Sequence, residues 1–88
     1  MGQELHGQLY HVYIIRSIPD PGQHYVGFTE DMKQRLSGHN AGDCPYTSKH
    51  RPWEIVSVIS FAGRERVLDF ERYLKSGSGR AFAARHLR

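Results

Sequence analysis

Residues 9–28 read LYHVYIIRSIPDPGQHYVGF. The first half of this stretch is rich in β-branched and aromatic residues, and apolar side chains occupy both of its alternating faces, as in a strand that is covered on two sides. The turn-forming residues 19–22 then separate it from a second short strand, expected at residues 24–28. The stretch therefore predicts an antiparallel hairpin whose first strand is central.

The rest of the chain predicts one more strand and three helices. Apolar and polar residues alternate at 53–61, which indicates the third strand. A first helix, capped by Thr29 or Glu30, is expected to run to about Asn40, with Gly42 just beyond its end. A polar loop, in which a short helical turn is allowed, follows until Pro52. The last two helices are expected at residues 64–75 and 80–87, with a break at 76–79.

Length and composition limit the class of protein. The chain has 88 residues, 39% of them hydrophobic, nine glycines and a mean hydropathy of -0.59, which fits one small globular domain. We expect this domain to occupy residues 9–88, after an N-terminal extension over residues 1–8 without fixed structure. Cys44 is the only cysteine, and neither a membrane span nor a signal peptide is recognisable. These features predict a cytoplasmic protein.

The positive charge of the chain is concentrated in its C-terminal third. The net charge is +3, yet residues 64–88 hold seven basic and three acidic side chains. A basic surface attracts phosphates and releases their counterions, so it is typical of nucleic-acid binding. Solvated helices are also often basic, and charge alone leaves that reading open.

A carboxylate interrupts the apolar stripe of the predicted helix at 64–75. At 100° per residue, Val67, Phe70 and Leu74 share one stripe, and Glu71 falls inside it. Burying a carboxylate is costly unless it is paired, protonated or bound to a metal ion. Glu71 is therefore a candidate site residue, with a buried ion pair or a shifted helix boundary as the alternatives.

The predicted helix at 31–40 carries a second pair of polar candidates. Arg35 and His39 are four residues apart, so they share one helix face. An arginine offers a rigid fork of donors to phosphate oxygens, and a histidine beside it can exchange a proton. The alternative is a surface arginine with a histidine that complements the helix dipole.

Two tyrosine tripeptides, Val-Tyr-Ile at 12–14 and Tyr-Val-Gly at 25–27, complete the set of candidates. A phenol can lose or share a proton, so Tyr13 and Tyr25 near an arginine could position water beside a phosphate diester. Either tyrosine alone is explained equally well by the preference of aromatic residues for strands.

With these residues in order, the chain resembles the GIY-YIG endonuclease family, in particular its small stand-alone bacterial members. The resemblance runs from about Tyr10 to Leu87 and includes the two tripeptides, Arg-Leu-Ser-Gly-His-Asn at 35–40, Arg-Pro-Trp-Glu at 51–54, and Glu71. It implies an α/β (α+β) fold, in which helices flank a three-stranded antiparallel sheet. It also implies hydrolysis of DNA phosphodiester bonds with one divalent ion, in DNA repair or recombination.

The resemblance assigns a role to each candidate. Glu71 would bind one Mg²⁺ or Mn²⁺ ion, whose other ligands are water and substrate oxygens. Tyr13 would be the general base, with its pKa lowered from about 10 by Arg35, the ion or His39. Tyr25 would orient water and phosphate, His39 would support proton transfer, and Arg35 would neutralise charge on the phosphate.

Further residues are expected to bind nucleic acid or to support the fold. The structural residues are Gly27 and Trp53, and the nucleic-acid-binding candidates are Tyr46, Lys49, His50, Arg51, Lys75 and Arg80. Residues 75–80 could instead hold a phosphate at a helix N-terminus, or form only a glycine break. The DNA could be branched or nicked, RNA stays open as a substrate, a protein partner is allowed, and no membrane contact is expected.

The sequence also departs from the family pattern. No asparagine or glutamine follows Glu71, where family members often carry an amide, and Phe28 or Thr29 replaces a lysine. A module that binds nucleic acid without cutting it is therefore the alternative. A zinc site formed by His39, Cys44 and His50 is a further alternative, although their spacing is loose.

Overall fold

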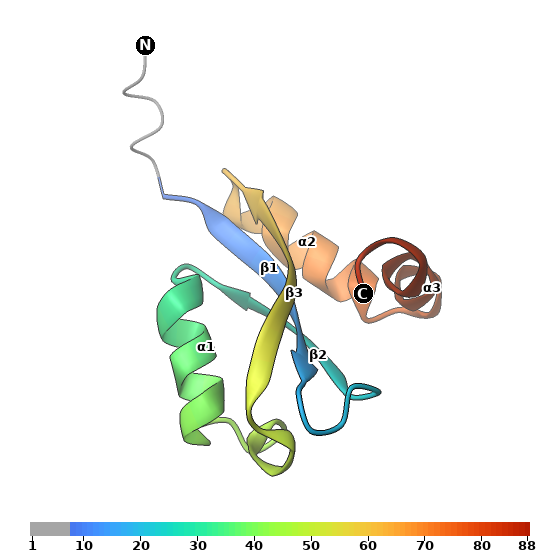
Figure 1. Cartoon of the computed structure of the whole chain (residues 1–88). Coiled ribbons are helices and arrows are strands. Elements are labelled where there is room, and N and C mark those ends of the chain that lie inside the picture. Colours follow the sequence, from blue (N-terminus) through green and yellow to red (C-terminus); the bar gives the residue numbers. More distant parts are fainter. Residues whose placement is uncertain (1–7) are drawn as a thin grey trace.

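The computed structural model describes residues 8–88 and has the predicted element order and class (Figure 1). The elements are β1 (Tyr10–Ser17), β2 (His24–Thr29), α1 (Met32–Ala41), the 3₁₀ turn η2 (Ser48–His50), β3 (Trp53–Phe61), α2 (Arg64–Leu74) and α3 (Gly77–His86). The extension predicted at residues 1–8 lies, apart from Gln8, outside the described residues. Within the described part, no helix combines the length and apolarity that crossing a membrane requires.

The three strands form one antiparallel sheet in the order β2-β1-β3, so the first predicted strand is the central one. Tyr13 of β1 lies opposite Gly27 of β2 and Val58 of β3. Between Ile14 and Ile15 the register against β3 shifts at an irregularity. Because β2 is an edge strand, a β1 side chain that extends over β2 reaches the border of the sheet.

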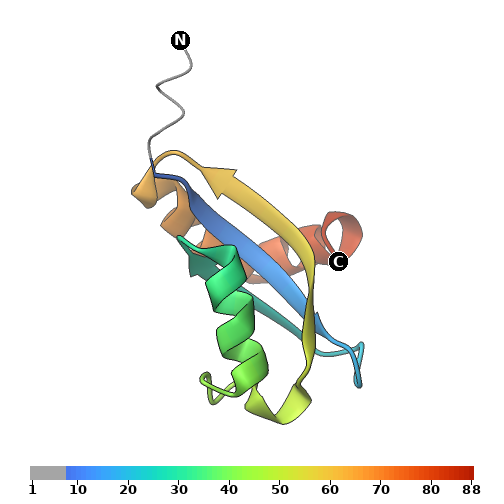
Figure 2. The same ribbon diagram turned by 60° about the vertical axis from the view of Figure 1, so that its left-hand side comes forward.

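Helices cover both faces of the sheet, as the apolar pattern of β1 requires. Val12 and Ile14 pack against α2 and α3, whereas Tyr13 and Ile15 face α1 on the other side. Figures 1 and 2 show this separation, with α1 on one face and α2 and α3 on the opposite one. All four of these strand residues are completely buried, so the alternation splits the interior into two small cores.

The N-cap of α1 differs from the predicted one. Asp31, rather than Thr29 or Glu30, caps the helix, and its Oδ1 accepts a hydrogen bond from the Gln34 backbone N–H at 3.1 Å. Thr29 Oγ1 instead accepts from the Asp31 backbone N–H at 3.1 Å, which fixes the approach to the helix. At the other end Gly42 adopts the left-handed conformation, with φ 87°, as expected for a helix-ending glycine.

The predicted break at residues 76–79 is wrong, because α3 already begins at Gly77. The Ser76 side chain caps this helix by accepting from the Gly79 backbone N–H at 3.2 Å. A Cβ on Gly79 would collide with the backbone carbonyl of Tyr73, so this glycine permits close packing of α3 against the end of α2. The Gly79 amide is thus engaged within the protein, which leaves the helix-terminal phosphate site without that donor.

Gly27 is required for a different reason, since the Tyr13 ring lies directly over it. A Cβ at this position would clash with the phenol carbon and oxygen of Tyr13. The structure therefore explains the second tripeptide partly by packing: the glycine of β2 makes room for the tyrosine of β1.

Replacing Gly27 by alanine should therefore push the Tyr13 ring out of place. We expect Gly27→Ala to lower the free energy of unfolding by about 1–3 kcal/mol, the usual cost of an overpacked interior. Urea denaturation monitored by circular dichroism measures this loss. Gly77→Ala is the matched control, because a Cβ there meets nothing within 4 Å. Equal stability of Gly27→Ala and the parent protein would contradict the packing argument.

Candidate active site

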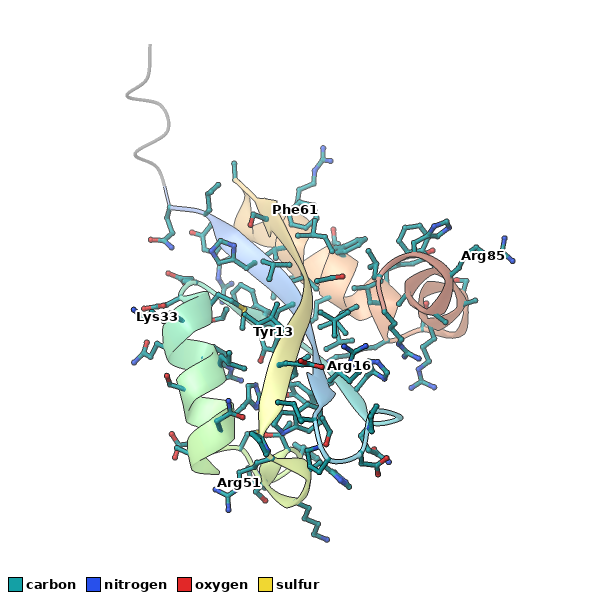
Figure 3. All side chains as sticks on the ribbon, in the orientation of Figure 1. Tyr13, Arg16, Lys33, Arg51, Phe61 and Arg85 are labelled. Atoms are coloured by element: carbon teal, nitrogen blue, oxygen red, sulfur yellow. The ribbon has the colours of Figure 1, made fainter. Side chains whose placement is uncertain are left out.

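The centre of the candidate site is the buried phenol of Tyr13, which points between the sheet and α1 (Figure 3). Its oxygen accepts a hydrogen bond from Arg35 Nε at 3.0 Å and lies 2.7 Å from His39 Nε2. Both partners come from the same face of α1, as their spacing predicted. The fold therefore brings together Tyr13, Arg35 and His39 from two elements far apart in the sequence.

The hydrogen bonds of His39 continue into the loop after α1. His39 is 1% exposed, and its Nδ1 lies 2.8 Å from Thr47 Oγ1. The Thr47 hydroxyl donates in turn to the Cys44 carbonyl at 3.4 Å. Thr47 therefore accepts from His39 Nδ1–H, which leaves His39 Nε2 as the acceptor of the Tyr13 hydroxyl proton. The hydrogen bonds thus form one series, in which Tyr13 donates to His39, His39 to Thr47, and Thr47 to the Cys44 carbonyl.

The loop that carries Thr47 is fixed to the start of β3. Trp53 Nε1 donates to the Thr47 carbonyl at 2.9 Å, and the indole is 4% exposed. The Asn40 side chain pairs with the Trp53 backbone, accepting from its N–H at 2.6 Å and donating to its C=O at 3.2 Å. Trp53 thus links α1, the loop and the sheet.

The surroundings raise the pKa of the Tyr13 phenol and lower the pKa of the His39 imidazole. Burial raises the pKa of Tyr13, and the hydrogen bond and charge of Arg35 only partly oppose this rise. Burial, followed by the charge of Arg35, lowers the pKa of His39 below its ordinary value of 6.5. The prediction that the pKa of Tyr13 is lowered was therefore wrong: the site holds a protonated phenol beside a neutral imidazole.

Tyr25 lies next to this cluster. Its ring centroid is 5.1 Å from that of His39 and 6.4 Å from that of Tyr13, with both ring pairs inclined to one another. Burial raises its pKa to about 12, and Tyr13 and Cys44 add to the rise. Tyr25 is thus a neutral hydroxyl that can donate a hydrogen bond. A hollow of about 300 Å³ opens beside these residues, lined by Arg35, His39 and Cys44 among others.

Glu71 reaches the same region from the opposite face of the sheet. Its negative charge adds, as the smallest contribution, to the rise in the pKa of Tyr13 that burial and Cys44 cause. The carboxylate side chain is 22% exposed and binds Lys75 Nζ at 3.1 Å. Glu71 thus forms an ion pair with a residue one turn later, but this pair is partly exposed and is not the buried pair offered as the alternative.

The donor set suits a cation that keeps most of its water. Residues 8–88 contain no group of three or more His, Cys, Asp or Glu side chains that could enclose an ion. Glu71 of α2 offers one carboxylate, and Mg²⁺ is commonly held by one or two carboxylates together with water and phosphate oxygens. A zinc site is disfavoured, since Tyr13 and Thr47 occupy both nitrogens of His39 and His50 packs edge-on against Trp53.

The six predicted nucleic-acid-binding residues fall into two groups. Tyr46, Lys75 and Arg80 line a second hollow beside Tyr25. Lys49, His50 and Arg51 lie around η2, where the Arg51 guanidinium packs against Gly42 at the end of α1. The contact of Thr47 with His39 was missed by the sequence-based predictions. No periodicity marks a loop hydroxyl as a partner of a histidine eight residues earlier.

Comparisons with known proteins found similar chains. Residues 9–83 match the GIY-YIG catalytic domain. The structure-specific endonuclease subunit SLX1 of Candida dubliniensis is 39% identical over 85 residues, which cover 89% of this chain and 28% of that protein. The SLX1 subunit of Debaryomyces hansenii is 35% identical over 81 residues, covering 84% and 23% respectively. The chain thus spans about a quarter of the length of these relatives.

A solved structure gives the same result for the fold. The solution structure of a UPF0213 protein from Bacillus halodurans matches with a TM-score of 0.52 and 25% identity. The match covers 86% of this chain and 82% of that one. A curated UPF0213 protein of Streptococcus pneumoniae is 36% identical over 55 residues, 61% of this chain and 56% of that protein. The fold is therefore shared with this UPF0213 protein of Bacillus halodurans.

The hydrogen bond from His39 to Thr47 gives a stability prediction for the site. Thr47→Val should leave the buried Nδ1–H without an acceptor and lower the free energy of unfolding by about 1–3 kcal/mol. Chemical denaturation in urea measures the change. Thr47→Ser keeps the hydroxyl and should lose much less. If the valine variant were as stable as the serine variant, the proposed direction of the hydrogen bonds would be wrong.

Proposed function

Since the chain belongs to the GIY-YIG family, we propose that it is an endonuclease that hydrolyses phosphodiester bonds in DNA with the help of one divalent ion. The observation that carries the proposal is the buried contact of Tyr13 with Arg35 and His39, at 3.0 and 2.7 Å. This contact places a proton acceptor, His39, and a cation that can bind phosphate, Arg35, around one phenol. Branched or nicked DNA, in repair or recombination, is the proposed setting, and a cytoplasmic location stays a prediction.

The pKa shifts decide how Tyr13 would act. A phenol whose pKa is raised does not exist as phenolate at neutral pH, so it cannot wait as a preformed base. It can, however, accept a proton from the attacking water while its own proton passes to neutral His39 Nε2. The water oxygen then bonds to phosphorus, and the bond to the leaving sugar oxygen breaks. Thr47 holds the imidazole in the required orientation.

Arg35 would have two successive partners. In the structure its Nε donates to the Tyr13 oxygen, while the rest of the side chain is exposed. A phosphate in the hollow would draw the guanidinium toward its own oxygens, because charge-assisted hydrogen bonds are stronger than a bond to a neutral phenol. This movement would open the Tyr13 oxygen to water. Tyr25, as a neutral donor, would orient the water and the phosphate.

Glu71 is the proposed ligand of the divalent ion. A bound Mg²⁺ or Mn²⁺ would supply positive charge next to the phosphate and the leaving oxygen. The ion pair with Lys75 partly orders the Glu71 carboxylate before any ion binds. A module that binds DNA without cutting it is the second candidate, favoured by the absence of an amide after Glu71.

The role of Tyr13 can be tested with a change of one atom. Tyr13→Phe should slow cleavage of DNA by about a hundredfold or more, the range in which general base catalysis contributes. Single-turnover cleavage of supercoiled and branched DNA in the presence of Mg²⁺ or Mn²⁺ provides the rate. Tyr10→Phe is the control, because Tyr10 is also on β1 but stacks on Phe28, away from the site. Equal rates for the two variants would remove Tyr13 from the mechanism.

The ion-binding role of Glu71 calls for a separate experiment. Glu71→Gln should abolish binding of Mn²⁺, measured by isothermal titration calorimetry, and slow cleavage by about a hundredfold, since an ion at the phosphate is worth several kcal/mol. Glu65→Gln, an exposed position in the first turn of the same helix, should change neither. Unchanged Mn²⁺ binding in Glu71→Gln would refute this assignment. Absence of cleavage by the intact protein with either ion would instead favour the non-cleaving module.

A further inference from the structure

A second hollow, of about 820 Å³, lies beside the outer strand β2. Tyr25 lines it together with Tyr46 of the loop, Lys75 after α2, Arg80 of α3 and Arg88. The ring of Tyr25 also packs against His39, which lines the first hollow. Tyr25 therefore connects the lining of the second hollow with that of the first.

The second hollow is positively charged. Its lining includes the basic side chains of Lys75, Arg80 and Arg88 and no Asp or Glu side chain. Lys75 is paired with Glu71, whereas Arg80 and Arg88 have no ion pair with another of the residues 8–88. Burial and then the charge of Arg88 lower the pKa of His24, which also lines the hollow. A polyanion would gain from these cations without having to break an ion pair of either arginine with another of the residues 8–88.

Tyr46 gives this hollow a second property. It is 83% exposed, far more than any other large apolar or aromatic side chain of residues 8–88. Its ring has no aromatic neighbour within that part of the chain, although its loop is held by the bonds of Thr47 and Trp53. An open aromatic face beside cations is the combination that binds unpaired nucleotides, because bases stack on the ring while phosphates meet the cations.

We propose that the second hollow binds a single-stranded segment of DNA directly beside the scissile phosphate, with a base stacked on Tyr46 and phosphates on Arg80 and Arg88. This assignment rests on the proposed cleavage of DNA at Tyr13 and specifies its substrate: a duplex with an unpaired arm. A base in a continuous duplex is already stacked on both faces, so a fully paired strand cannot offer one to Tyr46. Arg80 and Arg88 contact the DNA phosphates and therefore bind a strand of any base sequence.

The test is binding of DNA by the intact protein in EDTA, where fluorescence anisotropy reports affinity and a gel confirms uncut DNA. The parent protein should bind a duplex with a short single-stranded arm about tenfold more tightly than the same duplex with blunt ends, the order expected for stacking of one base. Tyr46→Ala should lose this preference, and Tyr46→Phe should keep it. Arg85→Ala is the charge control, because Arg85 lies on α3 but points away from the sheet (Figure 3).

A single abasic site moved along the arm identifies the stacked base. At one position it should weaken binding to the parent protein about tenfold and leave Tyr46→Ala unaffected, since both changes remove the same contact. Equal affinity of the parent protein for both DNAs, or an unchanged arm preference in Tyr46→Ala, would overturn the proposal. Because no cleavage enters the measurement, an arm preference without cutting would refute only the proposed enzyme activity. Cutting without arm preference would refute only the role of the second hollow.

Discussion

A hydrogen bond of 2.7 Å between the Tyr13 hydroxyl and His39 Nε2, buried between β1 and α1, is the constraint on which the rest of the site depends. Gly27 has to lack a side chain so that the phenol can cross β2. Helix α1 has to place His39 and Arg35 on its inner side, and Thr47 has to accept the second imidazole proton. Trp53 and Asn40 hold the loop that carries Thr47. A small core thereby holds Tyr13 and His39 in the arrangement that the proposed proton transfer requires.

Burial explains both the strength and the chemistry of this path. Removing a phenol from water disfavours its ionised form, and removing an imidazole from water disfavours the imidazolium. The pKa of Tyr13 is raised and that of His39 is lowered, so both groups are neutral at rest. A proton can then move from one to the other only while a new proton arrives at the phenol. Such coupling avoids a separated pair of charges in a site where charge is expensive.

The parts of the fold that follow from periodicity could be predicted from the sequence. The apolar faces of β1, the turn at residues 19–22 and the alternation at 53–61 each act within one element, and the observed strands agree with them. The start of α3 was misplaced because glycine is a poor helix former, while packing of Gly79 against Tyr73 and the Ser76 cap outweigh that preference. The predicted caps, Thr29 and Glu30, precede the observed cap, Asp31, by two residues and one residue.

The candidate site was less predictable, for a physical reason. The face shared by Arg35 and His39 follows from helix geometry, but their meeting with Tyr13 depends on the packing of α1 on the sheet. The rise in the pKa of Tyr13 depends on complete burial, which the pattern of a single strand does not reveal. The loop residue Thr47 and the basic hollow around Arg88 arise only when distant segments fold together. Tertiary structure alone creates these features.

The state of His39 tests the account most directly. Long-range ¹H–¹⁵N NMR spectra distinguish the two neutral tautomers of histidine from the doubly protonated ring. We expect a neutral ring in the free protein, with its proton on Nδ1, and we expect it to stay neutral as the pH falls past the ordinary pKa of 6.5. A proton on Nε2 would reverse the hydrogen bonds to Tyr13 and Thr47. That result, or an imidazolium already formed above pH 6.5, would contradict the proton path from Tyr13 to His39.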